Sequence, residues 1–553
     1  MRSHRFGECE GDARLAGIPL PDLNEPSMAG LGKGLVLAER VEKGRHVVAD
    51  REFPAGAVVL SQAPYQAVLH ADHVTRRCSY CLAPSDSLMR CGRSKFAKYC
   101  SKEHQRLDWG SGYKEECEAL RRCAPRIPTP TIRLLARVLW KKVRASSTED
   151  NPLSEWSSFE KIDGLLHHWE KLSDERKQTF TQMAVVTREY MYGLSSEVEN
   201  GVSVKEIAFL LAKFACNNHT ICDEELRVIG VGIYPLLCMV NHSCAPNCIQ
   251  VFRGRKLEFR ALHKISPGDE ITISYVDLMA TRFERRQQLL SNYHFDIDLS
   301  THSQDSHPPQ KVFSIDPHTK LRIFEGKGAP HRQDTIDQLL TGVEISSGGN
   351  ECRGYGVAIR EGGCQEGLCG DDANSTGFLE IHMWGGWEQR WGRAELKSMA
   401  SKLSHWARLF LEAERMAKGG DMSVGVVALE RVYRDSMENL SENVSLGDKH
   451  LFRCRVGLGL LKCAIDEGKN WKLALEVARD LAPVFEMVYS GGSPNLGLHL
   501  AGLAKMEVFC GDAEKGLLAA EKAMDVLKIA HSDLPVMEEV RRIRYECEQE
   551  LRS

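Results

Sequence analysis

The pattern of apolar and polar positions changes several times along this 553-residue chain. Between residues 35 and 69, short apolar runs alternate with Gly and Pro turns, which predicts small antiparallel strands. Residues 130–215 repeat apolar positions every three or four residues, as at Ile132, Leu135 and Leu139, which predicts helices. Strand-like runs then return at residues 229–240, 248–252, 257–261 and 270–275.

Two stretches carry little periodic signal. Residues 1–27 are polar and rich in Gly and Pro, and we expect them to form a poorly ordered tail. Residues 299–380 are rich in Gly, Ser, His and Asp, which predicts an insertion or linker and not a core.

From Leu396 onward almost the whole chain favours helix, with a weak internal repeat. Segments that start at Gly468 and Gly511 each open an amphipathic helix, and each is followed by a proline, Pro494 or Pro535. The period is longer than that of tetratricopeptide repeats (TPR), but stacked helix pairs would likewise bury a shared apolar seam. A repeat-like array is therefore predicted, and an irregular helical bundle is the alternative.

Charge and hydropathy argue against several classes of protein. Lys and Arg total 72 against 76 Asp and Glu, so no strongly basic face for direct nucleic-acid binding is expected. Apolar runs fall well short of the ~20 residues that cross a bilayer, and the charged N-terminus lacks the apolar core of a secretory signal. We therefore expect a cytoplasmic or nuclear protein, or one present in both, that does not bind membranes.

A cysteine-rich stretch indicates a metal rather than disulfides, because disulfides are rare inside the cell. Cys78 and Cys81 form a C-x2-C pair, and Cys100 and His104 follow as C-x3-H. These four ligands make one complete set for tetrahedral zinc, and the C-x3-H spacing predicts that its two ligands share one helix face.

A second metal site in this stretch would lack ligands. Cys91 and Cys117 supply two thiols, but Ser94 stands where a second C-x2-C would continue and Tyr113 where a histidine would stand. The sequence therefore predicts one zinc ion, with Cys91 and Cys117 left as half of a second candidate site.

Two polar motifs follow farther along the chain. Residues 241–244 read N-H-S-C, and residues 268–275 read G-D-E-I-T-I-S-Y. This pair resembles the signature of SET domains, and the cysteine-rich stretch resembles a MYND zinc finger placed inside such a domain. With C-N-N-H-T-I-C-D at residues 216–223, the chain resembles the SMYD (SET and MYND domain) family of protein-lysine methyltransferases over residues 35–295.

The resemblance implies an α+β fold: a SET-domain β-fold split by a MYND finger and a helical insertion, followed by an all-α, TPR-like C-terminal domain. The implied boundaries are 28–77 for the first part of the SET domain, 78–117 for the finger, 118–215 for the helical insertion, 216–298 for the SET core with a post-SET remnant, 299–385 for a variable insertion and 386–553 for the helical domain. We expect a monomer whose finger and helical domain bind protein partners.

The reaction implied is transfer of a methyl group from S-adenosylmethionine to a lysine of a protein, histone or non-histone. A lysine amine has an ordinary pKa near 10.4, so it must lose a proton before it attacks the methyl group. A narrow apolar channel disfavours the charged amine, and a tyrosine hydroxyl at its end can orient the nitrogen. The family pattern places Tyr275 there.

The resemblance also implies the binding residues. K-G-R at residues 43–45 matches the loop at the methionine end of the cofactor, where Lys43 would pair with the carboxylate. The implied cofactor contacts are Lys43, Gly44, Arg45, His168, Asn217, Asn241, His242, Tyr275 and Phe295. His219 and Tyr293 are expected to line the lysine channel, His219 in place of an aromatic residue.

One departure from the family pattern leaves a second function open. Relatives follow the Y-x-F segment with cysteines that bind a further zinc ion, whereas Ile297 and Leu299 stand at such positions here. Without that metal, we expect packing alone to hold residues 293–295. The alternative to an enzyme is a catalytically weak or inactive scaffold that binds proteins through the finger and the helical domain.

Overall fold

The computed structural model describes most of the chain. The described residues are 34–40, 43–146, 155–193, 202–297, 393–419, 422–441, 444–489, 491–531 and 535–552, together with five strands between residues 311 and 384. The expected tail at residues 1–27, Asp298 and much of the expected insertion lie outside these ranges.

Short antiparallel sheets form in the first half, as predicted. β1 (Leu35–Arg40) pairs with β2 (Gly44–Ala49). Two further sheets have three strands each. Their orders are β3 (Val58–Gln62), β11 (Lys256–Ala261), β10 (Cys248–Arg253) and β4 (Gln66–Leu69), β8 (Val228–Ile233), β7 (Asn218–Cys222). One β-domain is therefore built from two chain segments, which the finger and the helical insertion separate.

The two polar motifs meet in a pair of very short strands. β9 (Asn241–His242) runs parallel to β12 (Thr272–Ile273), with His242 opposite Ile273. The strand predicted over residues 229–240 is wrong in its second half. Pro235 has no N–H for a sheet hydrogen bond, and the chain then forms the 3-10 turn η5 (Leu237–Met239).

The finger and the helical insertion pack together through buried charges. Their elements are β5 (Met89–Arg90), β6 (Lys98–Tyr99), α1 (Lys102–Asp108), η2 (Trp109–Tyr113), α2 (Lys114–Cys123), α3 (Pro130–Ser146), α4 (Phe159–Asp163), α5 (Asp174–Met191) and α7 (Val204–Asn217). Glu116 on α2 is fully buried and accepts hydrogen bonds from Arg133, at 2.7 Å, and from Arg137 on α3. Arg137 also binds Asp108 at 2.8 Å, so every charge in this cluster is paired. Buried ions tolerate desolvation only when they are paired in this way, and the cluster therefore fixes the finger on α3.

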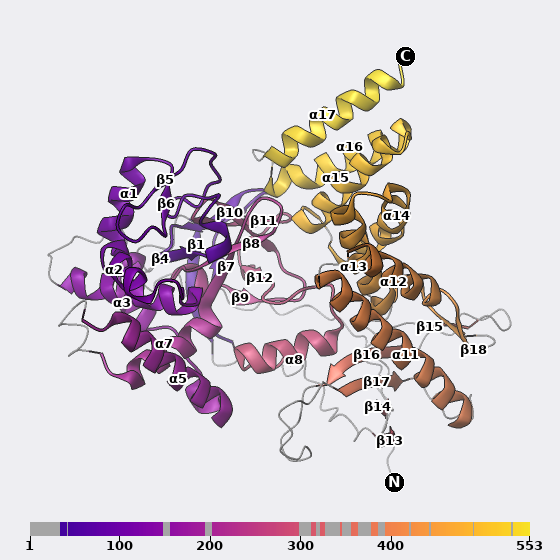
Figure 1. Cartoon of the computed structure of the whole chain (residues 1–553), viewed down its shortest axis with the longest axis horizontal. Coiled ribbons are helices and arrows are strands. Elements are labelled where there is room, and N and C mark those ends of the chain that lie inside the picture. The colour runs from indigo at the N-terminus through magenta and orange to yellow at the C-terminus, as the bar shows by residue number, and fades with distance from the viewer. Residues whose placement is uncertain are drawn as a thin grey trace, which may run out of the picture.

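From residue 393 onward the chain forms a curved array of helices (Figure 1). It contains α11 (Arg393–Lys418), α12 (Met422–Asp435), α13 (Leu451–Glu467), α14 (Trp471–Val488), α15 (Pro494–Phe509), α16 (Ala513–Ala530) and α17 (Pro535–Glu550). Among the described helices, none combines the length and apolar character needed to cross a membrane.

The predicted internal repeat is visible in how its helices begin. Gly468 and Gly511 have φ of 69° and 86°, a left-handed conformation that suits glycine. Asn470 and Asp512 then cap α14 and α16 by accepting a backbone N–H. The prolines at 494 and 535 begin the next helices, where a missing N–H costs nothing.

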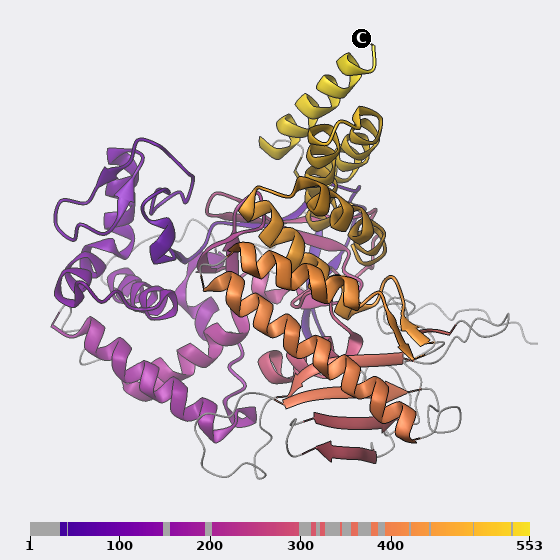
Figure 2. The same cartoon turned by 45° about the vertical axis from the view of Figure 1, so that its right-hand side comes forward.

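Strands also form inside the stretch expected to be an insertion. β13 (Lys311–Asp316), β14 (Leu321–Gly326), β17 (Phe378–Trp384) and β16 (Gly356–Gly362) form a sheet in that order, which lies beside α11 (Figure 2). β15 (Val343–Ile345) pairs with β19 (Val444–Leu446), which also pairs with β18 (Asn439–Ser441). These strands were not predicted, because their short apolar runs lie among long turn-forming segments.

Candidate active site

The four predicted zinc ligands converge. The ligand atoms of Cys78, Cys81, Cys100 and His104 all lie within 4.8 Å of one another. Zinc at ~2.3 Å from each sulfur sets neighbouring sulfurs about 3.8 Å apart, and the Sγ atoms of Cys81 and Cys100 are 3.8 Å apart. These residues therefore fit a tetrahedral zinc ion. The prediction that Cys100 and His104 share a helix face is wrong: Ser101 caps α1 by accepting the His104 N–H, so Cys100 precedes the helix.

The other half of the finger is held by a hydrogen bond. Ser94 Oγ and Tyr113 Oη lie 2.6 Å apart, beside the Sγ atoms of Cys91 and Cys117 at 3.8 Å from each other. Tyr113 Oη also accepts the Ala97 N–H at 3.3 Å. The four positions of a second metal site are thus brought together, but two of them are occupied by hydroxyl groups that bind each other.

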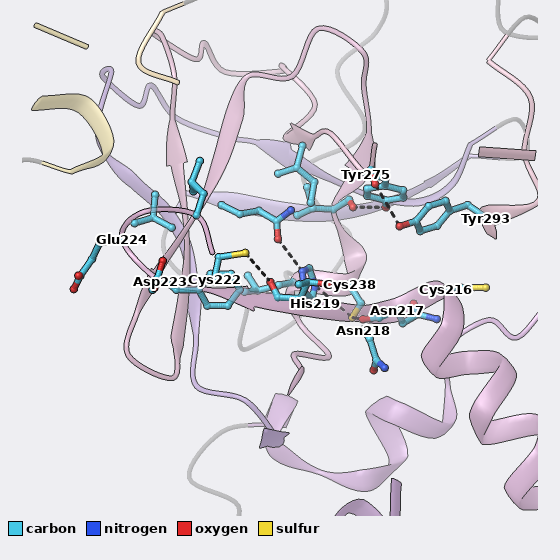
Figure 3. Close-up of a pocket in the computed structure, with 18 of the residues that line it drawn as sticks. Cys216, Asn217, Asn218, His219, Cys222, Asp223, Glu224, Cys238, Tyr275 and Tyr293 are labelled. Atoms are coloured by element: carbon cyan, nitrogen blue, oxygen red, sulfur yellow. Dashed lines mark hydrogen bonds between the residues drawn. The ribbon is translucent and has the colours of Figure 1, made fainter. Parts of the chain in front are cut away.

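A cavity of about 330 Å³ opens between α7, the sheet that contains β7 and β8, and the segment around Tyr275. Figure 3 shows Tyr275 and Tyr293 at one end and Asp223 and Glu224 at the other. Its lining includes the expected residues Asn217, His219, Tyr275 and Tyr293, and also Cys216, Cys222, Cys238, Gln250 and Ile273, with His531 from the helical domain.

Two tyrosine rings form one end of this cavity. The centroids of Tyr275 and Tyr293 are 4.7 Å apart, and the Tyr275 hydroxyl donates to the carbonyl of Val240 at 2.7 Å. Burial raises the pKa of Tyr275, so its phenol stays protonated. Because that proton is directed at Val240, the hydroxyl oxygen keeps lone pairs that can accept from a ligand.

Two histidines near the tyrosines are held neutral. Burial, helped by the charge of Arg285, lowers the pKa of His242 to about 4, and burial lowers the pKa of His219 to about 4. His242 Nδ1 accepts the Tyr275 N–H at 3.0 Å, and His219 Nδ1 lies 2.9 Å from Gln250 Oε1. Each ring therefore has its tautomer set by a partner and adds no positive charge beside the cavity.

A charged pair connects the K-G-R loop with the N-H-S-C motif. Glu270 accepts from Lys43 Nζ at 2.6 Å and from Asn241 Nδ2 at 3.2 Å. Sequence reasoning missed Glu270 as a site residue, although it lies within the quoted G-D-E-I-T motif. Lys43, expected to pair with a cofactor carboxylate, pairs with Glu270 here.

The remaining predicted cofactor residues bind or contact neighbouring parts of the protein. Arg45 donates to the carbonyl of Gly164 at 2.9 Å, and Gly44 has a left-handed φ of 69°. Asn217 donates to the carbonyl of Lys213 at 2.7 Å at the end of α7. His168 precedes the 3-10 turn η4 (Trp169–Lys171), with its ring 5.3 Å from that of His294. Phe295 is 36% exposed, and its ring lies 6.0 Å from His242.

One ion pair and two side-chain hydrogen bonds hold the end of α8 (Arg282–Tyr293) and the residues that follow it. Asp296 binds Arg286 through two hydrogen bonds, at 2.7 and 2.5 Å. Lys171 donates to the carbonyl of His294, and Arg176 to that of Ser291. The expectation that packing alone holds residues 293–295 is therefore wrong, because these side chains bind the segment directly.

The sequence of this chain is similar to a known domain family and to several lysine methyltransferases. The family model for the SET domain matches residues 44–276. Histone-lysine N-methyltransferase ASHR1 of Arabidopsis thaliana is 27% identical over 90% of this chain and 92% of its own length. Human histone-lysine N-methyltransferase SMYD3 is 36% identical over 40% of this chain and 50% of its own length. N-lysine methyltransferase SMYD2-A of Xenopus laevis is 33% identical over 57% of this chain and 75% of its own length. The chain therefore belongs to the SMYD family and is a SET-domain lysine methyltransferase.

Proposed function

We propose that this enzyme methylates the ε-amine of a lysine in a protein substrate, with Tyr275 as the catalytic residue that orients the amine. The observation that carries this proposal is the cavity with Tyr275 and Tyr293 together at one end. A lysine side chain is long and mostly apolar, so it can enter such a cavity while the rest of the substrate stays outside.

The chemistry of the tyrosine end favours a neutral amine. The two histidines beside it are uncharged, and burial away from water disfavours an ammonium that has no counter-charge. The Tyr275 oxygen can accept a hydrogen bond from the amine while its own hydroxyl proton is donated to the carbonyl of Val240. This arrangement positions the nitrogen lone pair for in-line attack and does not require Tyr275 to ionise.

The Lys43–Glu270 pair is proposed to bind the amino-acid end of S-adenosylmethionine, which supplies the methyl group as a sulfonium. That end carries both an ammonium and a carboxylate. Glu270 and Lys43 present the two complementary charges, and Asn241 adds an amide to the same cluster. When the Lys43–Glu270 pair separates, Lys43 can bind the cofactor carboxylate and Glu270 can bind the cofactor ammonium. No charge is then left unpaired. Phe295 and His242 offer ring faces nearby.

Further assignments belong to this proposal. Zinc is proposed at Cys78, Cys81, Cys100 and His104, because the ligand atoms fit its geometry. Both histone and non-histone proteins stay open as substrates. The names of ASHR1 and SMYD3 specify a histone lysine, whereas the name of SMYD2-A specifies a lysine without naming the protein that carries it. We propose a cytoplasmic or nuclear location, a role in chromatin if histones are methylated, and partner binding by the finger and the helical domain.

Calorimetric titration with S-adenosylmethionine tests the cofactor half of this proposal. We expect saturable heat with the wild-type protein, and about tenfold or more weaker affinity for Asn241→Ala, because a hydrogen bond to a charged group is lost. Tyr275→Phe should bind the cofactor as the wild type does. Absence of heat with folded wild-type protein would contradict an enzyme and favour the scaffold alternative.

A further inference from the structure

One chain segment both starts and ends at the cavity tyrosines. It begins at Tyr275, turns through residues 276–281, and continues as α8 to Tyr293. Figure 1 shows α8 between the helices α5 and α7 on one side and the curved array of C-terminal helices on the other. The separation of the two rings, 4.7 Å between centroids, therefore depends on what holds this segment in place.

The turn after Tyr275 is anchored in the C-terminal helical domain. Met279 is 5% exposed and belongs to the hydrophobic core of that domain, with Leu278 packed against the same core. Asp277 Oδ1 accepts the Met279 N–H at 2.9 Å and the hydroxyl of Tyr489 at 2.7 Å. Tyr489 follows α14 and is buried. Burial and the charge of Asp277 raise the pKa of Tyr489, so the phenol remains a donor.

A second contact fixes the start of α8. Thr281 and Glu284 form a capping box there, in which each side chain binds the other's backbone N–H. Glu284 Oε1 also pairs with Arg455 of α13 at 2.9 Å. The helical domain therefore holds this segment through two polar contacts and one apolar contact, all located between the two cavity tyrosines.

We propose that Tyr489 is a positioning residue: its hydrogen bond to Asp277 lets the helical domain set the place of Tyr275 at the end of the lysine channel. The domain would thus support catalysis in addition to any partner binding. This inference rests on the proposed role of Tyr275. An ångström of displacement at a reacting group can lower a rate by up to about a hundredfold, so partial loosening should have a measurable effect.

The test compares two tyrosine variants of the full-length protein. Tyr489→Phe removes the hydroxyl and keeps the ring. Tyr433→Phe is the matched control, because the Tyr433 hydroxyl binds Asp480 at 2.9 Å wholly within the helical domain. The readouts are labelled-methyl incorporation into core histones and cell extract at saturating S-adenosylmethionine, cofactor affinity, and hydrogen exchange of residues 275–281.

We expect Tyr489→Phe to lower the incorporation rate by about tenfold and to speed exchange in residues 275–281 severalfold, with cofactor affinity unchanged. Tyr433→Phe should lower the melting temperature but change neither the incorporation rate nor the exchange of residues 275–281. Asp277→Asn keeps the acceptor oxygen and should stay near the wild-type rate, whereas Asp277→Ala should lose at least as much as Tyr489→Phe, because it also removes the acceptor of the Met279 N–H. Adding Tyr489→Phe to Asp277→Ala should change the rate little further, because the bond between Tyr489 and Asp277 is already lost in Asp277→Ala.

Two results would overturn the positioning role: unchanged exchange in Tyr489→Phe, or equal rate losses in both tyrosine variants. If Tyr489→Phe does not fold, Arg455→Gln, at a half-exposed position, is measured in the same way and should also speed exchange near residue 281. Hydrogen exchange separates this inference from the proposed function. Wild-type protein that transfers no label would contradict the function, while exchange would still decide whether the contact orders the segment.

Discussion

Replacing Tyr275 with phenylalanine is expected to lower the rate of methyl transfer by about a hundredfold, or ~2.7 kcal/mol of transition-state stabilisation. The ring stays, so the contact with Tyr293 and the shape of the cavity should persist. Only the hydroxyl that orients the amine is lost, and its contribution is greatest in the transition state. We therefore expect a lower kcat with nearly unchanged affinity for S-adenosylmethionine.

Tyr234→Phe is the matched control for this variant. Its hydroxyl donates to the carbonyl of Arg255 at 2.8 Å, so it too is a buried tyrosine bonded to a backbone oxygen in the SET domain. It does not line the cavity. Both variants should lose about 1 kcal/mol of stability, but only Tyr275→Phe should lose turnover. Equal rates in wild type and Tyr275→Phe would exclude Tyr275 from the proposed role.

Purified protein is expected to hold one zinc ion per chain, and removing it should unfold the finger. Structural zinc contributes an apparent ~10–16 kcal/mol in small zinc-binding domains, so its loss exceeds any single side-chain effect. Cys78→Ser should abolish binding, because a hydroxyl is a poor zinc ligand and the set has only four members.

Cys91→Ser tests whether the other half of the finger contributes a metal. Cys91 is as buried as Cys78 and belongs to the same finger, but its neighbours include the hydrogen-bonded Ser94 and Tyr113. This variant should keep its zinc. Metal analysis that gives two or more ions per chain, or a loss of zinc in Cys91→Ser, would contradict the single-site assignment.

The sequence was informative where residue type and spacing alone define the chemistry. The zinc ligands are an example, because C-x2-C and C-x3-H specify four ligands whatever the details of the fold. The same spacing misled on local structure: Ser101, directly after Cys100, caps α1, so the helix begins at Lys102 and Cys100 stands outside it.

Interactions between distant segments could not be predicted in this way. Arg286 and Asp296 hold the segment that in relatives is followed by zinc-binding cysteines, yet neither belongs to a motif. Tyr489 and Asp277 are separated by more than 200 residues, and nothing in the local pattern marks either as a partner. Glu270 was visible inside a quoted motif, but its link to Lys43 depends on how β1, β2 and β12 assemble.

The most direct test of the central claim is to locate the transferred methyl group. The wild-type protein, Asn241→Ala and Tyr275→Phe are incubated with methyl-labelled S-adenosylmethionine and a mixture of core histones and cell extract, and labelled peptides are sequenced by tandem mass spectrometry. We predict label on lysine ε-amines with the wild type, and strongly reduced label with both variants. Label on another side chain, or no label from any folded wild-type sample that binds the cofactor, would contradict the account.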